Sequence, residues 1–171
     1  MTLRNQRRLP EREETVDEDL RELHDKVEHF GWAVVHTEDE GDGPGFSYSV
    51  GLHRSFQHPE VIAFGLREDT RQQILNNIAN QVRSGVRFEP NQTSDQVLNG
   101  FDCAFRAVAP GAVRYYMGMA VRFYDADVPA LHCVWPDRNG HFPWDAASAA
   151  EYRWLQPMLS EGPESFTTAR P

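Results

Sequence analysis

The sequence predicts a single α+β domain, in which one mixed or antiparallel sheet carries two to three packed helices. The first observation behind it is a succession of helix-like and strand-like segments in the order α-β-β-β-α-β-β-α-β, which mixes adjacent strands with helices. The second is a length of 171 residues, which suits one domain. The third is a hydrophobic content of 40%, which is ordinary for a chain with one buried core.

The domain is expected to occupy residues 14–145. Residues 1–13 are polar and charged without an apolar period, so they are expected to form a disordered tail. Residues 146–171 are expected to be a short helix-like piece followed by a loose tail, because the apolar pattern fades after Asp145.

The first expected element is an amphipathic helix that begins near residue 15 and ends at Gly31. Thr15 and Glu18 have the spacing of a capping box, and Gly31 suits the left-handed position after a helix. Apolar residues recur at steps of four and three on one face of this helix, namely Val16, Leu20, Leu23, Val27 and Phe30.

Three strands are expected next, over residues 32–37, 46–51 and 61–66. An acidic turn rich in glycine, residues 38–45, separates the first two; its carboxylates are suitable calcium ligands, but their spacing favours a surface turn. The second strand alternates large apolar residues with Ser47, Ser49 and Gly51, which leaves room on one face. A loop over residues 53–59 leads to the third strand, which is continuously apolar and is expected to be central.

The second half begins with a helix over residues 74–82 that Gly85 ends. Residues 86–100 are expected to be a short strand and a polar loop, before a strand over residues 101–107. Residues 112–125 fit a helix and a strand equally well by pattern; we favour the helix, because strands of that length are uncommon. A last strand over residues 129–135 precedes an aromatic loop, residues 136–144.

Charge and composition argue against a nucleic-acid-binding, membrane-spanning or secreted protein. The formal net charge of −9 disfavours a nucleic-acid partner, which needs a basic face. No apolar run of about 18 residues predicts a membrane span, and no apolar segment near the N-terminus predicts a secretory signal. Cys103 and Cys133 are expected to be buried, reduced thiols of a cytoplasmic protein, although their spacing leaves a disulfide open.

The stretch before the third strand holds the best candidates for acid–base catalysis. His53, His58 and Glu60 lie close together, and histidine paired with a carboxylate can transfer protons near neutral pH. The same side chains could instead hydrogen-bond the loop backbone. A metal-dependent hydrolase centred on His36, His53 and His58 is a further alternative, although no two of them have the spacing of ligands on one element, and no metal ligand is assigned.

The aromatic loop supplies candidate binding residues. Trp135, Pro136 and Trp144 form a rigid apolar wall, beside which Asp137 and Arg138 could orient a polar ligand. The alternative is an aromatic plug that closes the core, with Asp137 capping a turn.

A pocket between these two stretches and the strand that carries Tyr48 and Ser49 would bind a small polar or aromatic molecule, with acid–base chemistry as an option. No motif predicts a particular cofactor, since phosphate loops, zinc helices and nucleophile elbows are absent from the sequence. The main alternative is a protein-interaction module without catalysis, with the aromatic loop as its contact surface.

The order of several short motifs resembles a known family. Gly31-Trp32, residues 46–52 (FSYSVGL), His58-Pro59-Glu60, Trp135-Pro136-Asp137 and Phe142-Pro143-Trp144 follow one another as in the bacterial domain-of-unknown-function family numbered 4262. At position 132 that family is expected to carry Gln, and this chain has His132. The resemblance spans about residues 17–145 and implies a small bacterial, cytosolic protein, without assigning an activity or catalytic residues.

Overall fold

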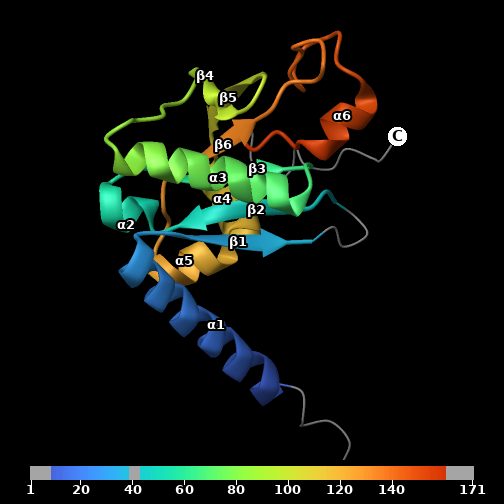
Figure 1. Cartoon of the computed structure of the whole chain (residues 1–171). Coiled ribbons are helices and arrows are strands. Elements are labelled where there is room, and N and C mark those ends of the chain that lie inside the picture. The colour runs from blue at the N-terminus through green and yellow to red at the C-terminus, as the bar shows by residue number, and fades with distance from the viewer. Residues whose placement is uncertain (1–8, 39–42, 161–171) are drawn as a thin grey trace, which may run out of the picture.

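The computed structural model describes residues 9–38 and 43–160, with the side chains of residues 9–13 left aside. Within these ranges the chain forms one sheet with helices on both of its faces (Figure 1). The predicted α+β class is therefore confirmed.

The sheet is mixed. Its strands lie in the order β1-β2-β3-β6-β5-β4. The central strands β3 and β6 are parallel, and every other neighbouring pair is antiparallel. The strand bounds are Ala33–Thr37 for β1, Phe46–Val50 for β2, Glu60–Phe64 for β3, Thr93–Leu98 for β4, Phe101–Ala107 for β5 and Ala130–Val134 for β6.

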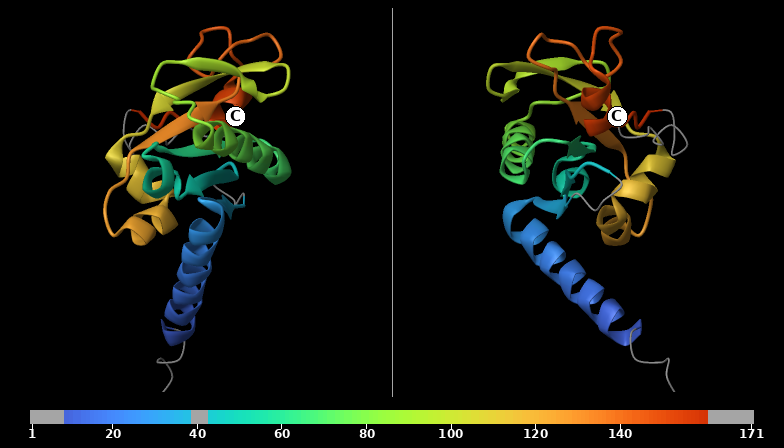
Figure 2. Two further views of the ribbon diagram at one scale, coloured as in Figure 1. Left: turned by 60° about the vertical axis from the view of Figure 1, so that its left-hand side comes forward. Right: turned by 90° about the vertical axis from the view of Figure 1, so that its right-hand side faces the viewer.

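Six helices accompany the sheet in the described residues, where two to three were expected. The views in Figures 1 and 2 show α3 on one face, with α4 and α5 on the other. The helix bounds are Leu9–Phe30 for α1, Leu52–Phe56 for α2, Glu68–Arg83 for α3, Pro110–Tyr116 for α4, Gly118–Tyr124 for α5 and Ala150–Leu155 for α6.

Two hydrophobic cores result, one on each face of the sheet. Neighbouring residues of β3 point to opposite faces, as in any strand: Val61 joins the core under α3, and Ile62 joins the core under α4 and α5. All five residues of β3 are buried, as are all five of β6. The expectation of a central third strand is therefore confirmed.

Helix α1 differs from its prediction at its start. It begins at Leu9, so Thr15 lies inside the helix and the expected capping box is wrong. Proline at position 10 suits this earlier start, because its backbone angle favours the first helical turn. Of the tail expected over residues 1–13, residues 1–8 lie outside the described residues. Figure 2 shows that the N-terminal part of α1 projects from the body of the protein.

Two further segments differ from their predictions. The expected loop over residues 53–59 contains the short helix α2, which begins directly after Gly51. Residues 112–125 are helical, as favoured, but they form two helices that meet at Met117, whose backbone angles (φ −111°, ψ 45°) are not helical. The expected helix-like piece after residue 145 is α6.

Gly51 is the glycine on which the junction of β2 and α2 depends. Its φ is +112°, and a Cβ atom there would lie 2.8 Å from both the Gly31 carbonyl oxygen and the Val27 Cγ1 atom. Gly85 has a comparable φ of +100°, but a Cβ atom there would meet nothing within 4 Å. A side chain would therefore meet both backbone strain and crowding at Gly51, but backbone strain alone at Gly85.

We predict that Gly51→Ala lowers the free energy of unfolding by about 2–5 kcal/mol, because strain and overpacking both act there. Gly85→Ala should cost only about 1–2 kcal/mol, because strain acts alone. Urea denaturation of the two variants and the parent measures this difference. Equal losses at the two positions would contradict the crowding at Gly51.

Candidate functional site

The two sequence stretches expected to share one pocket lie at opposite ends of β3. Glu60 is the first residue of this strand, and Phe64 is the last. The loop after β6 lies at the Phe64 end, because β6 runs parallel to β3 and the Trp135 indole N–H donates to the Phe64 carbonyl oxygen at 2.8 Å. The single pocket predicted between the histidine stretch and the aromatic loop is therefore wrong.

Glu60 is fully buried and acts as an anchor for α2. One of its carboxylate oxygens accepts hydrogen bonds from the Gly51 N–H (2.9 Å), the His53 N–H (3.1 Å) and the Tyr124 hydroxyl (2.5 Å). The other accepts from the Ser49 hydroxyl at 2.6 Å. Because these bonds already surround both oxygens, the carboxylate holds the backbone of the β2–α2 turn in place.

Burial without a cation shifts the ionisation of the groups in this cluster. Desolvation raises the pKa of Glu60, and the hydrogen bonds from Ser49 and Tyr124 only partly oppose it. Burial and the neighbouring Glu60 carboxylate raise the pKa of Tyr124 as well. Glu60 is therefore part of a polar network that is bonded within the protein.

His58 is also fully buried, and both of its ring nitrogens bind the backbone. Nε2 accepts from the Phe88 N–H at 3.0 Å, so Nδ1 carries the proton and donates to the Pro59 carbonyl oxygen at 2.7 Å. Burial lowers the pKa of His58, which keeps the ring neutral. These bonds favour the structural alternative for His58 and Glu60. Their catalytic role stays a prediction.

The remaining histidines of the prediction do not converge with His58. His53 is exposed and packs edge-on against the Tyr124 ring at 5.7 Å. Both ring nitrogens of His36 are engaged, with the Ser47 hydroxyl at 2.7 Å and with Gln72 at 3.0 Å. Among the described residues, no group of histidine, cysteine and acidic side chains is arranged to hold a metal ion.

Tyr48 and Ser49, expected to bind substrate, are buried parts of the framework. The Tyr48 hydroxyl accepts from the Met119 N–H at 3.2 Å, and burial raises its pKa to about 12. The Ser49 hydroxyl accepts from the Val61 N–H at 2.9 Å while it donates to Glu60. The small residues of β2 therefore leave no open face, because their hydroxyl groups are already bonded within the protein.

An apolar groove lies at the other end of β3, with a volume of about 710 Å³. This is the size at which protein pockets hold small molecules. Three of its lining residues, Trp135, Asp137 and Arg138, belong to the predicted binding set. The groove is lined by Leu66, Thr70, Leu98, Phe101, Trp135, Pro136, Asp137, Arg138, Ala149, Glu151, Tyr152 and Leu155.

Helix α6 is fastened to Trp135 at the back of the groove. The buried Gln156 side chain donates to the Trp135 carbonyl oxygen at 2.8 Å and accepts from the Trp135 N–H at 3.1 Å. The Tyr152 hydroxyl also donates to the Trp135 carbonyl oxygen, and the two rings pack edge to face at 5.0 Å. Leu155 packs closely on Gly65, where a Cβ atom would lie 2.7 Å from the Leu155 carbonyl oxygen. The groove wall is therefore preformed.

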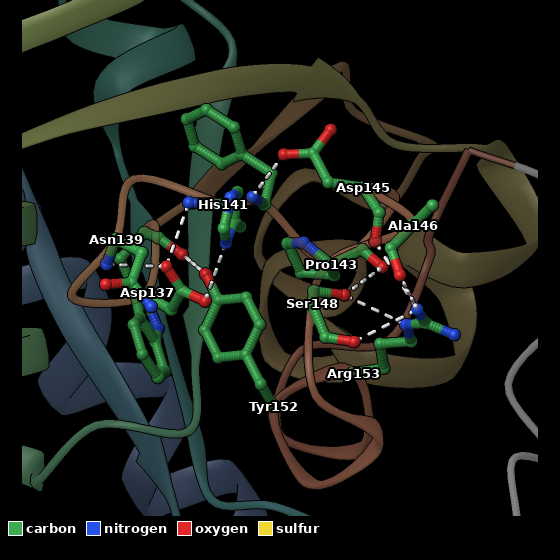
Figure 3. A network of polar contacts seen from close by, with 11 residues as sticks. Asp137, Asn139, His141, Pro143, Asp145, Ala146, Ser148, Tyr152 and Arg153 are labelled. Atoms are coloured by element: carbon green, nitrogen blue, oxygen red, sulfur yellow. Dashed lines mark hydrogen bonds and ion pairs between the residues drawn. The ribbon is translucent and has the colours of Figure 1, made fainter.

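The loop after β6 is held by side chains that cap its turns (Figure 3). One Asp137 oxygen accepts from the Asn139 N–H (2.8 Å) and the His141 N–H (2.9 Å), and these bonds lower the pKa of Asp137, that from His141 most strongly. Further along, Arg153 donates to the Ser148 hydroxyl at 2.9 Å and to three backbone carbonyl oxygens of residues 145–148. Asp137 thus caps a turn, which was the alternative expectation, at the edge of the groove.

Trp144 lies apart from the groove. Its ring stacks on Phe142 at 4.9 Å, and the Arg106 guanidinium lies 4.7 Å from its centre. Trp144 was expected in the binding set and does not line the groove. Sequence reasoning missed the groove residues outside the aromatic loop. Of these, only the residues of α6 were anticipated at all, as part of the expected helix-like piece after residue 145.

A comparison with protein-family models gives one finding. The model described as "Domain of unknown function (DUF4262)" matches residues 26–149, well over half of the chain. The chain belongs to this family. The resemblance inferred from the order of its motifs is thereby confirmed. No curated protein and no solved structure matches the chain.

The DUF4262 region and the groove overlap only in part. The matched region includes β3, β6 and the loop through Ala149, but it ends before Tyr152 and Leu155.

In the described residues, no helix is long and apolar enough to cross a membrane. At position 132, where Gln was expected for the family, His132 is buried against the Phe64 ring, and burial lowers its pKa to about 3.

We predict that the stability contribution of Glu60 declines as pH rises. Between its ordinary pKa of 4.5 and its higher pKa in the folded protein, the folded state keeps a proton that the unfolded state has lost. Glu60→Gln removes this titration, so the difference in unfolding free energy, parent minus variant, should fall as pH rises through that window. Chemical denaturation at several pH values from about 3 to 7 measures it.

Glu22→Gln is the matched control for this prediction. Lys26 lies 2.7 Å from Glu22 and lowers its pKa, so the corresponding difference for Glu22 should rise with pH up to about its ordinary pKa of 4.5 and then stay level. A difference for Glu60 that also rises with pH would show that its carboxylate is stabilised, rather than penalised, by its buried site.

Proposed function

We propose that this DUF4262 protein binds a small, largely apolar molecule with an aromatic ring in the groove beside Trp135. The observation that carries the proposal is a preformed hollow of about 710 Å³ whose wall is built mainly from apolar side chains. Trp135, Tyr152 and Phe101 offer aromatic surfaces to such a ring.

A polar end on the ligand would meet the rim of the groove. Arg138 is exposed and makes no hydrogen bond or ion pair with any described residue, so its guanidinium is free to bind an acceptor on the ligand. Asp137 is less free, because two backbone N–H groups already bind one of its oxygens. Arg138 is therefore the better candidate for orienting the ligand.

The proposed role is binding without catalysis. The twelve residues that line the groove include no histidine, cysteine or serine, and His58 and Glu60 are committed to the framework at the opposite end of β3. The alternative of a protein-interaction module stays a prediction, with Trp144, which is 37% exposed, as its contact residue. The proposed setting is a bacterial cytosol, in agreement with the free, buried thiols of Cys103 and Cys133.

Indole tests the groove directly. We predict that titration of the ¹⁵N-labelled protein with indole shifts the Trp135 side-chain N–H signal and the backbone signals of residues 135–138, and that these shifts saturate. Phe101→Asp should weaken this binding at least about tenfold, because the groove loses an aromatic wall and gains a charge. Phe101 is 36% exposed at the end of β5, so the variant is expected to fold.

Tyr115→Asp is the matched control. Tyr115 is 72% exposed on α4, outside the groove, and the substitution makes the same change from an aromatic ring to a carboxylate. It should leave the affinity for indole unchanged. Shifts that never saturate, or equal losses in the two variants, would remove the support for an aromatic site in this groove.

A further inference from the structure

A second hollow, of about 610 Å³, lies between α1, the edge strand β1 and α3. No aspartate or glutamate lines it, although the chain carries 26 acidic residues against 17 lysines and arginines. It is lined by Lys26, His29, Phe30, Trp32, Ala33, Val34, Gln72, Asn76, Asn80 and Arg83. We call it the donor hollow, because several of its side chains present hydrogen-bond donors.

Three side-chain amides form one stripe of α3 in the donor hollow. Gln72, Asn76 and Asn80 are spaced by four residues, so they lie on the same face of the helix. The Asn76 oxygen accepts from the Trp32 indole N–H at 3.0 Å, and the Asn80 oxygen accepts from the Arg83 guanidinium at 2.8 Å. Indole and guanidinium can only donate, so each amide oxygen is assigned, and each NH₂ group has no hydrogen-bond partner among the described residues.

The third amide is oriented by a chain of hydrogen bonds through the sheet. The Arg71 Nε–H donates to the buried Ser47 hydroxyl at 2.9 Å. The hydroxyl hydrogen is then directed to His36 Nδ1 at 2.7 Å, so the ring carries its proton on Nε2. That N–H donates to the Gln72 oxygen at 3.0 Å, which leaves the Gln72 NH₂ group free as well.

Two cations border the same amides. The Arg83 guanidinium lies over the Trp32 ring at 5.2 Å, which holds it at the hollow while Asn80 binds one of its nitrogens. Lys26 forms an ion pair with Glu22 at 2.7 Å, but Glu22 does not line the hollow. The chain has a net charge of −9, yet charges beyond about 8–10 Å are largely screened at physiological ionic strength. Because Glu22 pairs with Lys26, the Arg83 guanidinium, which forms no ion pair with a described carboxylate, supplies most of the positive charge at the hollow.

We propose that the donor hollow binds an oxyanion, the phosphate or carboxylate group of a small molecule. Free NH₂ groups and cations are complementary to a group that only accepts hydrogen bonds. The amide oxygens that would repel an anion already accept hydrogen bonds from Trp32, Arg83 and His36. The proposal does not depend on the groove beside Trp135, because the two hollows share no lining residue.

The test titrates the ¹⁵N-labelled full chain with inorganic phosphate and, separately, with acetate, and compares each with chloride at equal ionic strength and pH. The side-chain NH₂ signals of Gln72, Asn76 and Asn80 should shift saturably with at least one oxyanion and not with chloride. The oxyanion that binds more tightly identifies the preferred group. Shifts that do not saturate, or that chloride reproduces, would overturn the proposal.

Asn76→Asp isolates the free NH₂ group. The substitution keeps an oxygen to accept the Trp32 indole N–H and replaces the NH₂ group by a charged oxygen of the same size. The affinity for the bound oxyanion should fall at least about tenfold, while the Trp32 side-chain signal stays dispersed. Asn80→Asp, at an exposed position, should have the same effect and serves as a second variant should the first fail to fold.

Gln73→Glu is the matched control. It adds the same charge to an exposed position of α3 that does not line the donor hollow. It should change the affinity less than about twofold, the size of effect expected from a screened surface charge. Binding by Asn76→Asp and Asn80→Asp that matches the parent, or an equal loss in Gln73→Glu, would overturn the role of the amides.

Discussion

The parallel pairing of β3 with β6 is the constraint on which the rest of the structure depends. It is the one parallel pair among the strands that the structure describes. The chain that leaves the carboxyl end of β3 must therefore return to the end of the sheet where β3 begins before β6 can start. On this route α3 covers one face of the sheet, and α4 and α5 cover the other. The pairing also places the loop that follows β6 at the carboxyl end of β3. The loop of Trp135 and the stretch before Glu60 are therefore kept apart.

Each end of β3 uses its polar groups differently. At the amino end, Glu60 and His58 bind backbone N–H and carbonyl groups that the turn into α2 and the segment near Phe88 would otherwise leave unpaired. Such groups are costly to bury alone, which explains why a carboxylate and an imidazole occupy positions with no exposed surface. At the carboxyl end, Gln156 satisfies both backbone groups of Trp135. The backbone at the back of the groove therefore needs no further hydrogen-bond partner, and the groove can remain largely apolar.

Much of the fold could be predicted from local patterns, and much of the site could not. Alternation and apolar runs found β2, β3, β5 and β6, and a period of three to four found α3, because each pattern reports a face buried against neighbours. The role of His58 depends on the Phe88 N–H, thirty residues away in the sequence, which no spacing reveals. The groove joins Leu66, Phe101 and Tyr152 from separate elements. The sequence does not show that β3 and β6 are parallel, so the two halves of the expected pocket could not be assigned to different ends.

The same limit explains why amide residues are hard to interpret from sequence. Asparagine and glutamine carry both a donor and an acceptor, so Gln72, Asn76 and Asn80 predict no charge preference by themselves. Their preference arises only when Trp32, Arg83 and His36 use the oxygens. Trp32 belongs to a motif by which the family was recognised, and its indole N–H is the group that orients Asn76. A family motif can therefore set the chemistry of a surface indirectly, by fixing which atom of a neutral neighbour remains free.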